Sequence, residues 1–224
     1  MLISHSHKFV FVHIPKTAGT SVRHVLQPYC ESPTGNKRWR RLLRKLGVRQ
    51  DPAKAHFRGH DTARQVRAAF GPAYDTYLTF SVVRNPFDHA VSHYSFLKEA
   101  PNAKYREYFG GMSFDDYLSF RNRLTALTPL PPFATIKDQT SFVADGAGRI
   151  IVSRILKFEE LATAFPALLA ELGIEDQSLP RKRATKARGA SLSDYYGSED
   201  TVRRVRELYS RDFENFGYSV DLPG

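Results

Sequence analysis

The chain has 224 residues, 42% of them hydrophobic, so it is long enough to bury a sizeable core, and we expect one domain over residues 1–224. Its formal net charge of +10 and its pI near 9.8 favour a polyanionic or multiply phosphorylated partner, with nucleic acid, acidic glycan and nucleotide all open. Cys30 is the only cysteine, which excludes an internal disulfide framework and a cysteine-rich metal site.

The first apolar run, residues 9–12, predicts a strand that is buried on both faces. The run is too short to span a bilayer and lacks a signal-peptide cleavage pattern, so we expect a soluble, cytoplasmic protein. Small residues and Gly19 follow it, as a backbone needs if its N–H groups are to close around a compact anion. Thr20 or Ser21 can cap the next helix. The order of strand, tight loop and helix N-terminus therefore predicts a phosphate site.

Lys16 stands at the entry of this loop, before its only glycine, whereas a nucleotide-triphosphate loop requires a Gly-Lys pair. A strand followed by Pro-Lys-Thr, a small residue and Gly-Thr-Ser resembles the 5′-phosphosulfate loop of the sulfotransferases that use 3′-phosphoadenosine-5′-phosphosulfate (PAPS). The alternative is an ordinary strand–turn–helix junction with a solvated lysine. The resemblance implies that the donor is bound by Pro15, Lys16, Thr17, Ala18, Gly19, Thr20 and Ser21.

A strongly basic segment over residues 37–49 carries apolar residues at helical spacing, including Trp39 and Leu46. We expect an amphipathic helix with Trp39 in its apolar stripe. Its arginines form either a solvated face or a landing surface for an anionic acceptor, and the sequence leaves both open.

His60 precedes a helix that we expect to run to Phe70 and to be capped by Asp61 or Thr62. The imidazole thus lies at a junction, where it can titrate near neutral pH, and histidine is the commonest general base. A Gly-His pair before a helix resembles the segment that carries the catalytic histidine in the uronyl 2-O-sulfotransferase branch. The alternative is a capping or turn histidine.

The second buried strand is expected over residues 77–83, followed by Arg84, the N-cap Asn85 and a proline at the first helical position. Ser92 comes about two helical turns after Asn85, so it projects from the side of the helix on which Arg84 lies. Val-Arg-Asn-Pro with this serine is similar to the 3′-phosphate element of the same family. A packed serine and a helix-start arginine are the alternative. Because parallel strands bind ligands at their carboxyl ends, both matched elements are expected to face one site.

The later chain is expected to hold a helix capped by Ser113 and Asp116, strands over residues 140–143 and 149–156 joined as a hairpin, a helix ended by Gly173, and one final helix. A basic loop over residues 180–189 separates the last two helices, and such a loop is usually a solvated surface. Sulfotransferases bring a late basic loop over the 3′-phosphate, and the residues that resemble it are Arg183, Thr185 and Lys186.

Taken together, the resemblance implies a single α/β domain with a central parallel sheet flanked by helices, in a P-loop-like sulfotransferase fold. The implied reaction moves the sulfuryl group of PAPS to an acceptor hydroxyl and leaves adenosine 3′,5′-bisphosphate, with His60 as base and Lys16 stabilising the leaving phosphate. No metal is expected. The expected acceptor is a carbohydrate, possibly an anionic one, rather than nucleic acid, although a small alcohol or phenol stays open.

Two other functions are consistent with a basic α/β protein. An ATP-dependent kinase requires a Gly-Lys loop and a magnesium-binding aspartate near a strand end, and the sequence has neither. A non-catalytic polyanion-binding protein requires dispersed basic residues, and its binding would depend on salt but not on a particular nucleotide.

Overall fold

The structure is a computed structural model that describes residues 1–33, 38–39, 42–43, 46–99, 103–122, 138–175 and 191–223. The chain divides into two compact units, Met1–Val83 with Thr140–Lys182, and Arg84–Gln139 with Arg183–Gly224. The predicted loop residues Arg183, Thr185 and Lys186 lie outside the described residues.

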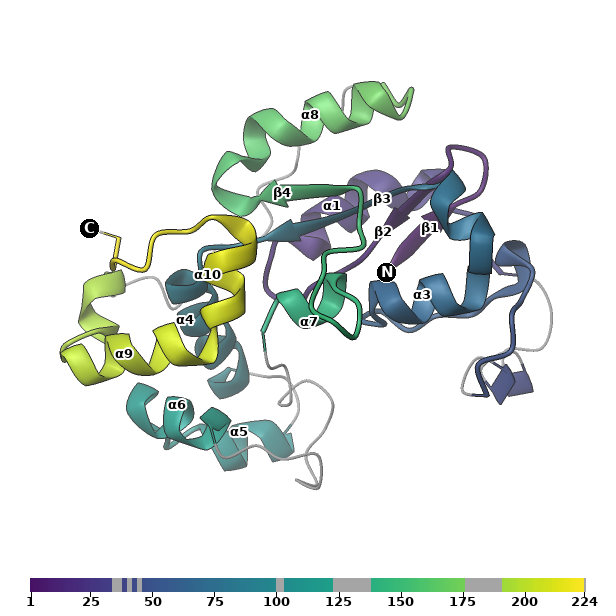
Figure 1. The fold of residues 1–224 in the computed structure, drawn as a ribbon. Helices are drawn as coiled ribbons and strands as arrows, with labels where there is room; N and C mark the ends of the chain where they lie inside the picture. Colours follow the sequence, from purple (N-terminus) through teal and green to yellow (C-terminus); the bar gives the residue numbers. More distant parts are fainter. Residues whose placement is uncertain are drawn as a thin grey trace. The chain divides into compact units, whose positions relative to one another are not determined.

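The first unit is built on a four-stranded sheet whose strands lie side by side in the order β1-β2-β3-β4 (Figure 1). The strands are β1 (Leu2–Ser4), β2 (Phe9–Phe11), β3 (Leu78–Val83) and β4 (Arg154–Lys157). β1 pairs antiparallel with β2, while β2–β3 and β3–β4 are parallel, so the predicted α/β class with a mainly parallel sheet is confirmed. Every residue of β2 is buried, as its apolar run predicts.

Helices of the first unit complete its core around this sheet (Figure 1). They are α1 (Gly19–Leu26), α3 (Ala63–Phe70), α7 (Thr140–Val143) and α8 (Leu161–Glu171), with short 3₁₀ turns at Gln27–Tyr29, Pro52–Lys54, Gly71–Thr76 and Phe158–Glu160. The apolar stripes of α1 and α8 form one cluster with the sheet residues Phe9, Phe11, Phe80, Val82 and Leu156. This packing anchors the β2–α1 junction to the core.

The second unit is helical. It consists of α4 (Pro86–Lys98), α5 (Ala103–Phe109), α6 (Phe114–Asn122), a 3₁₀ turn at Leu192–Tyr195, α9 (Glu199–Leu208) and α10 (Ser210–Phe216). Its core contains Phe87 and Leu97 of α4, Tyr117 of α6, and Tyr209 and Phe213 near the chain's end. The predicted cap of α6 is confirmed, because Ser113 Oγ donates to Asp116 Oδ2 at 2.7 Å and accepts from the Asp116 N–H at 3.1 Å.

Three expectations about local structure are wrong. Residues 140–143 form helix α7 rather than a strand, and the expected hairpin is reduced to one isolated bridge between Ala144 and Ile150. β4 instead pairs in parallel with β3. Its Leu156 side chain packs in the same core cluster as the apolar residues of α8. The expected final helix is interrupted at Tyr209 and becomes α9 and α10.

Of the predicted basic helix over residues 37–49 only parts belong to the described residues. There the side chains of Trp39 and Leu46 are 56% and 67% exposed. Trp39 is therefore not buried in an apolar stripe, contrary to our expectation.

Candidate active site

The loop between β2 and α1 has an unusual backbone. Lys16 and Ala18 both have positive φ, 69° and 62°, although neither is glycine. Each such residue costs roughly 1–2 kcal/mol relative to an ordinary conformation. Alternation of left-handed with ordinary residues turns successive N–H groups toward one side and forms an anion-binding concavity. The strain therefore supports a functional loop rather than a plain junction.

Helix α1 begins earlier than expected. Its N-cap is Ala18, whose carbonyl accepts from the N–H groups of Ser21 and Val22 at 2.9 and 3.1 Å, so the expectation of a Thr20 or Ser21 cap is wrong. Ala18 has a left-handed backbone conformation, and α1 begins at the next residue, Gly19. In the part of the chain that the structure describes, no hydrogen bond engages the N–H groups of residues 17–20. These four amides, together with the positive end of α1, are the groups that the predicted anion site would use.

The side chains of the loop have separate structural tasks. The Thr17 side chain is buried, and its Oγ1 donates to the Ile14 carbonyl at 2.9 Å. This bond stabilises the turn at the start of the loop. Gly19 has no room for a side chain, because a Cβ there would lie 1.7 Å from His13 Nε2. A glycine at this position is thus required by the His13 ring and not only by the phosphate that the loop is expected to bind.

His60 lies in the turn before α3, as expected, and Thr62 caps that helix. The Thr62 Oγ1 accepts from the Gln65 N–H at 3.3 Å, and the Gln65 side chain accepts from the Thr62 N–H at 2.8 Å. Asp61, the other candidate cap, instead accepts from the Arg58 N–H at 2.6 Å. These bonds fix the turn that carries His60.

The His60 imidazole is held by His13. Its Nδ1 lies 3.0 Å from the His13 carbonyl oxygen, and the two ring centroids are 4.5 Å apart. A carbonyl can only accept, so Nδ1 carries the hydrogen and Nε2 carries the lone pair of the neutral ring. Burial lowers the pKa of His60 below its ordinary value, which keeps the ring neutral and basic at neutral pH.

Arg84, which follows β3 in the chain, lies in the second unit at the start of α4. Asn85 caps α4 as predicted, because its Oδ1 accepts from the Phe87 N–H at 3.0 Å. The Arg84 Nε donates to Asp88 Oδ2 at 2.6 Å, and both Arg84 and Ser92 are largely buried. Asp88 and Ser92 are four residues apart on one face of α4, and Arg84 contacts that face through Asp88.

The sequence did not reveal two residues that hold the Arg84 backbone. Gln139 accepts from the Arg84 N–H and donates to the Arg84 carbonyl, both at 2.8 Å. Asp212 in turn accepts from the backbone N–H of Gln139 at 2.8 Å. All three lie far apart in the sequence, so only the fold could identify this clamp. This clamp fixes the backbone from which the Arg84 side chain reaches Asp88.

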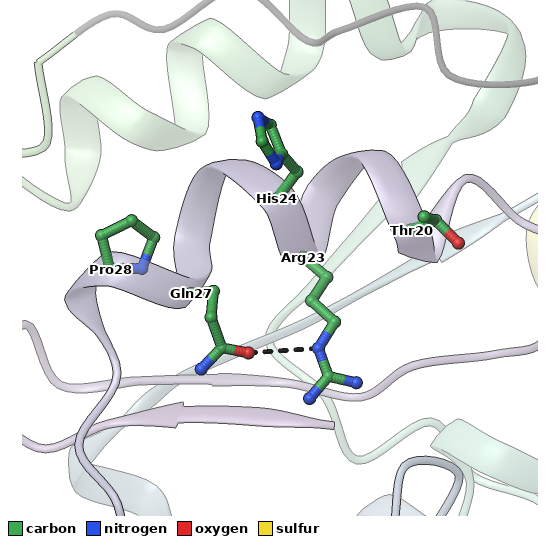
Figure 2. A pocket seen from close by; sticks show the side chains of 5 residues that line it. All are labelled: Thr20, Arg23, His24, Gln27 and Pro28. Carbon is green, nitrogen blue, oxygen red and sulfur yellow. Dashed lines mark hydrogen bonds between the residues drawn. The ribbon is translucent and has the colours of Figure 1, made fainter.

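The exposed side of α1 bears an open hollow of about 560 Å³ (Figure 2). It is lined by Thr20, Arg23, His24, Gln27 and Pro28, and the Arg23 Nε donates to Gln27 Oε1 at 3.1 Å. The hollow begins at Thr20, one of the four loop residues whose N–H groups can bind an anion. One cation, Arg23, therefore lies in a hollow that reaches the loop at Thr20.

These features define an α/β protein with a strand–loop–helix junction whose backbone suits an anion, and with a neutral histidine beside it. Among the described ranges, no group of three or more His, Cys, Asp or Glu side chains could hold a metal ion, and no described helix is long and apolar enough to cross a membrane.

The model of the Sulfotransferase family matches residues 1–219, so the chain belongs to this family. No curated protein and no solved structure gives a significant match.

Proposed function

We propose that this protein transfers the sulfuryl group of PAPS to a hydroxyl group of a carbohydrate. One observation supports this assignment above the others, namely the contact of His60 with His13, whose ring in turn covers Gly19 of the anion-binding loop. Only the His13 ring separates the neutral His60 base from the backbone that would bind the phosphate. A base in this place can take the proton from a nucleophile that attacks the group carried by that phosphate.

In the proposed reaction the acceptor oxygen attacks sulfur in line with the bond that breaks. His60 Nε2 takes the hydroxyl proton while the new O–S bond forms. The bond from sulfur to the bridging oxygen breaks, and adenosine 3′,5′-bisphosphate leaves with that bond's electron pair. Lys16 neutralises the charge that develops on the leaving phosphate, and the N–H groups of residues 17–20 hold its 5′-phosphate oxygens.

Arg84 and Ser92 are the proposed ligands of the 3′-phosphate, joined by Arg183, Thr185 and Lys186 from the family's late basic loop. Two points support this. β2 and β3 are neighbours and parallel, and the loop follows the first strand in the chain as Arg84 follows the second. A guanidinium carries N–H donors in a planar fork that matches phosphate oxygens, which suits Arg84 to this role.

An anionic carbohydrate is the acceptor class that the charges favour. The net charge is +10, and Arg23 lies in the hollow that starts at the loop. The match to the uronyl 2-O branch rests on the Gly-His pair before α3 and remains part of this proposal. A screen of glycan acceptors with labelled PAPS would identify the acceptor.

Binding of the product provides the direct test of the donor. Adenosine 3′,5′-bisphosphate at a hundred times its Kd should stabilise the protein by about 2.7 kcal/mol and raise its melting temperature, whereas ATP should not. Thermal unfolding followed by circular dichroism measures both shifts. An equal shift with ATP would favour the kinase alternative. Binding of neither nucleotide, with salt-sensitive binding of heparin, would favour a polyanion-binding protein.

Arg84→Ala tests the 3′-phosphate assignment. The variant should bind adenosine 3′,5′-bisphosphate at least about tenfold more weakly, because a charge-assisted bond is worth roughly 1.5–3 kcal/mol, while 5′-AMP affinity stays nearly unchanged. Calorimetric titration with both nucleotides measures this difference. Arg203→Ala is the matched control, since Arg203 of the same unit is exposed and paired with Asp200 and Glu207. Equal weakening for both nucleotides would place Arg84 elsewhere.

A further inference from the structure

His13 is the residue on which the loop and the base meet, and the expected catalytic scheme does not use it. It follows β2 immediately after Val12, and its ring stacks on Phe11 with centroids 5.7 Å apart and planes 20° apart. Residues two apart on extended backbone share one face, so β2 delivers the ring to this place. Phe11 is itself buried in the sheet core, so the ring rests on a rigid support.

Two further contacts surround the same ring. One is with Gly19, at which any Cβ would collide with His13 Nε2, and the other is with the His60 ring, whose centroid lies 4.5 Å away. The main chain of His13 adds the carbonyl that orients His60 Nδ1 at 3.0 Å. A single residue thus contacts both the donor loop and the base.

We propose that His13 is a positioning residue that sets the distance between the anion-binding loop and the basic Nε2 of His60. This inference rests on the proposed function and deepens it. The carbonyl selects the tautomer of His60, while the ring acts as a spacer between the His60 ring and the backbone at Gly19. His13 takes no proton in the reaction. Its ring stays neutral, because burial lowers the pKa of His13 to about 2.

The charged groups near the pair also bear on its protonation. After burial, the hydrogen bond to the His13 carbonyl raises the pKa of His60, and Asp61 raises it as well. The Met1 amino group and Arg23 lower the pKa of both rings, and His60 lowers that of His13. Because burial by its surroundings is the main cause of the lowered pKa of His60, removal of the His13 ring should raise this pKa toward the ordinary histidine value. The acidic limb of the rate profile should then move to higher pH.

The steric part of the proposal is tested with Gly19→Ala, with the double variant that adds His13→Ala, and with Gly146→Ala as control. Gly146 belongs to the same unit, and a Cβ there would meet only the flexible Arg64 guanidinium at 3.6 Å. Gly19→Ala should weaken adenosine 3′,5′-bisphosphate binding by more than about tenfold, since displaced loop N–H groups lose charge-assisted hydrogen bonds to the phosphate. The double variant should regain most of this affinity, and the control should keep it.

If Gly19→Ala fails to fold, circular dichroism should still show a folded double variant, because removal of the ring removes the collision. A double variant that binds as weakly as Gly19→Ala, or that also fails to fold, would overturn the steric role. Retention of full affinity by Gly19→Ala alone would overturn it as well.

The positioning part is tested with His13→Ala and His13→Phe. His13→Ala should lower the single-turnover rate of sulfuryl transfer by about tenfold or more, with bisphosphate affinity little changed, and His13→Phe should restore much of that rate by supplying a ring of similar shape. NMR titration of the His60 ring should show a higher pKa in His13→Ala and a value near that of the unmodified protein in His13→Phe.

The NMR titration also distinguishes this inference from the proposed function. An unchanged His60 titration in His13→Ala would overturn the positioning role even in an active sulfotransferase. A shifted titration in a protein that neither binds the bisphosphate nor transfers sulfuryl groups would support the His13–His60 coupling and refute the function.

Discussion

His60→Ala should lower the rate of sulfuryl transfer by ~10²–10⁴, the usual worth of a general base, while adenosine 3′,5′-bisphosphate binds nearly as before. We expect this loss of rate because the tautomer of His60 places a basic nitrogen where it can accept the proton. The His13 carbonyl holds the hydrogen on Nδ1, so the lone pair that accepts the acceptor's proton is on Nε2. His60→Asn provides a sharper comparison, because its amide nitrogen is bonded to Cγ as Nδ1 is and can still donate to the His13 carbonyl, but the side chain has no basic nitrogen.

The pH dependence of the same reaction follows from the His60 pKa. A protonated imidazole cannot accept a proton, so kcat/KM should fall as the pH drops through that pKa and stay level above it. Because burial lowers this pKa, the fall should occur below the ordinary histidine value of about 6.5.

Rapid quench with labelled PAPS measures the rate, and calorimetry measures the affinity. His7→Ala is the matched control, because His7 lies in the turn between β1 and β2, at the end of β2 opposite the loop. A His60→Ala variant that retains more than about a tenth of the rate would remove His60 from the chemistry.

Lys16→Ala should reduce kcat by ~10²–10³, as loss of one group that stabilises developing transition-state charge does elsewhere. The bisphosphate affinity should fall far less, because the charge on the bridging oxygen develops only as the bond to sulfur breaks. Comparison of steady-state kcat with the calorimetric Kd separates the two effects.

Lys8→Ala is the control for backbone strain. Lys8 also has positive φ, 53° against 69° for Lys16, and it precedes β2 rather than following it. Both substitutions therefore place alanine in a left-handed conformation, but only one removes a charge from the proposed site. Equal losses of activity in the two variants would attribute the effect to the backbone, and Lys16 would lose its assigned role.

Local sequence patterns were sufficient to predict those elements whose structure depends on residues close together in the chain. The all-buried β2 follows from its aromatic and β-branched run, and the start of α4 follows from Asn85 and Pro86. Residues 140–143 show the limit of such patterns. A short apolar run fits a strand or a buried helix equally, and its packing beside α3 decided for the helix.

The loop between β2 and α1 also has features that the sequence predicts and features that it does not. Its small residues and Lys16 predicted an anion site, but the left-handed backbone at Ala18, which starts α1 early, depends on torsion angles that no residue type there demands. The collision that excludes a side chain at Gly19 comes from His13, six residues earlier. Sequence reasoning could have noticed His13 only as a polar residue two positions after Phe11.

The sequence by itself determined the two buried parallel strands, the caps of α4 and α6, and the residue types that an anion site and a base require. These depend on hydrophobic periodicity and on hydrogen bonds between residues a few positions apart. Only the tertiary structure decided the tautomer of His60, the spacer role of His13 and the clamp of Gln139 and Asp212 on Arg84. Each of these arises from contacts between residues that are distant in the chain, and such contacts exist only once the core has packed.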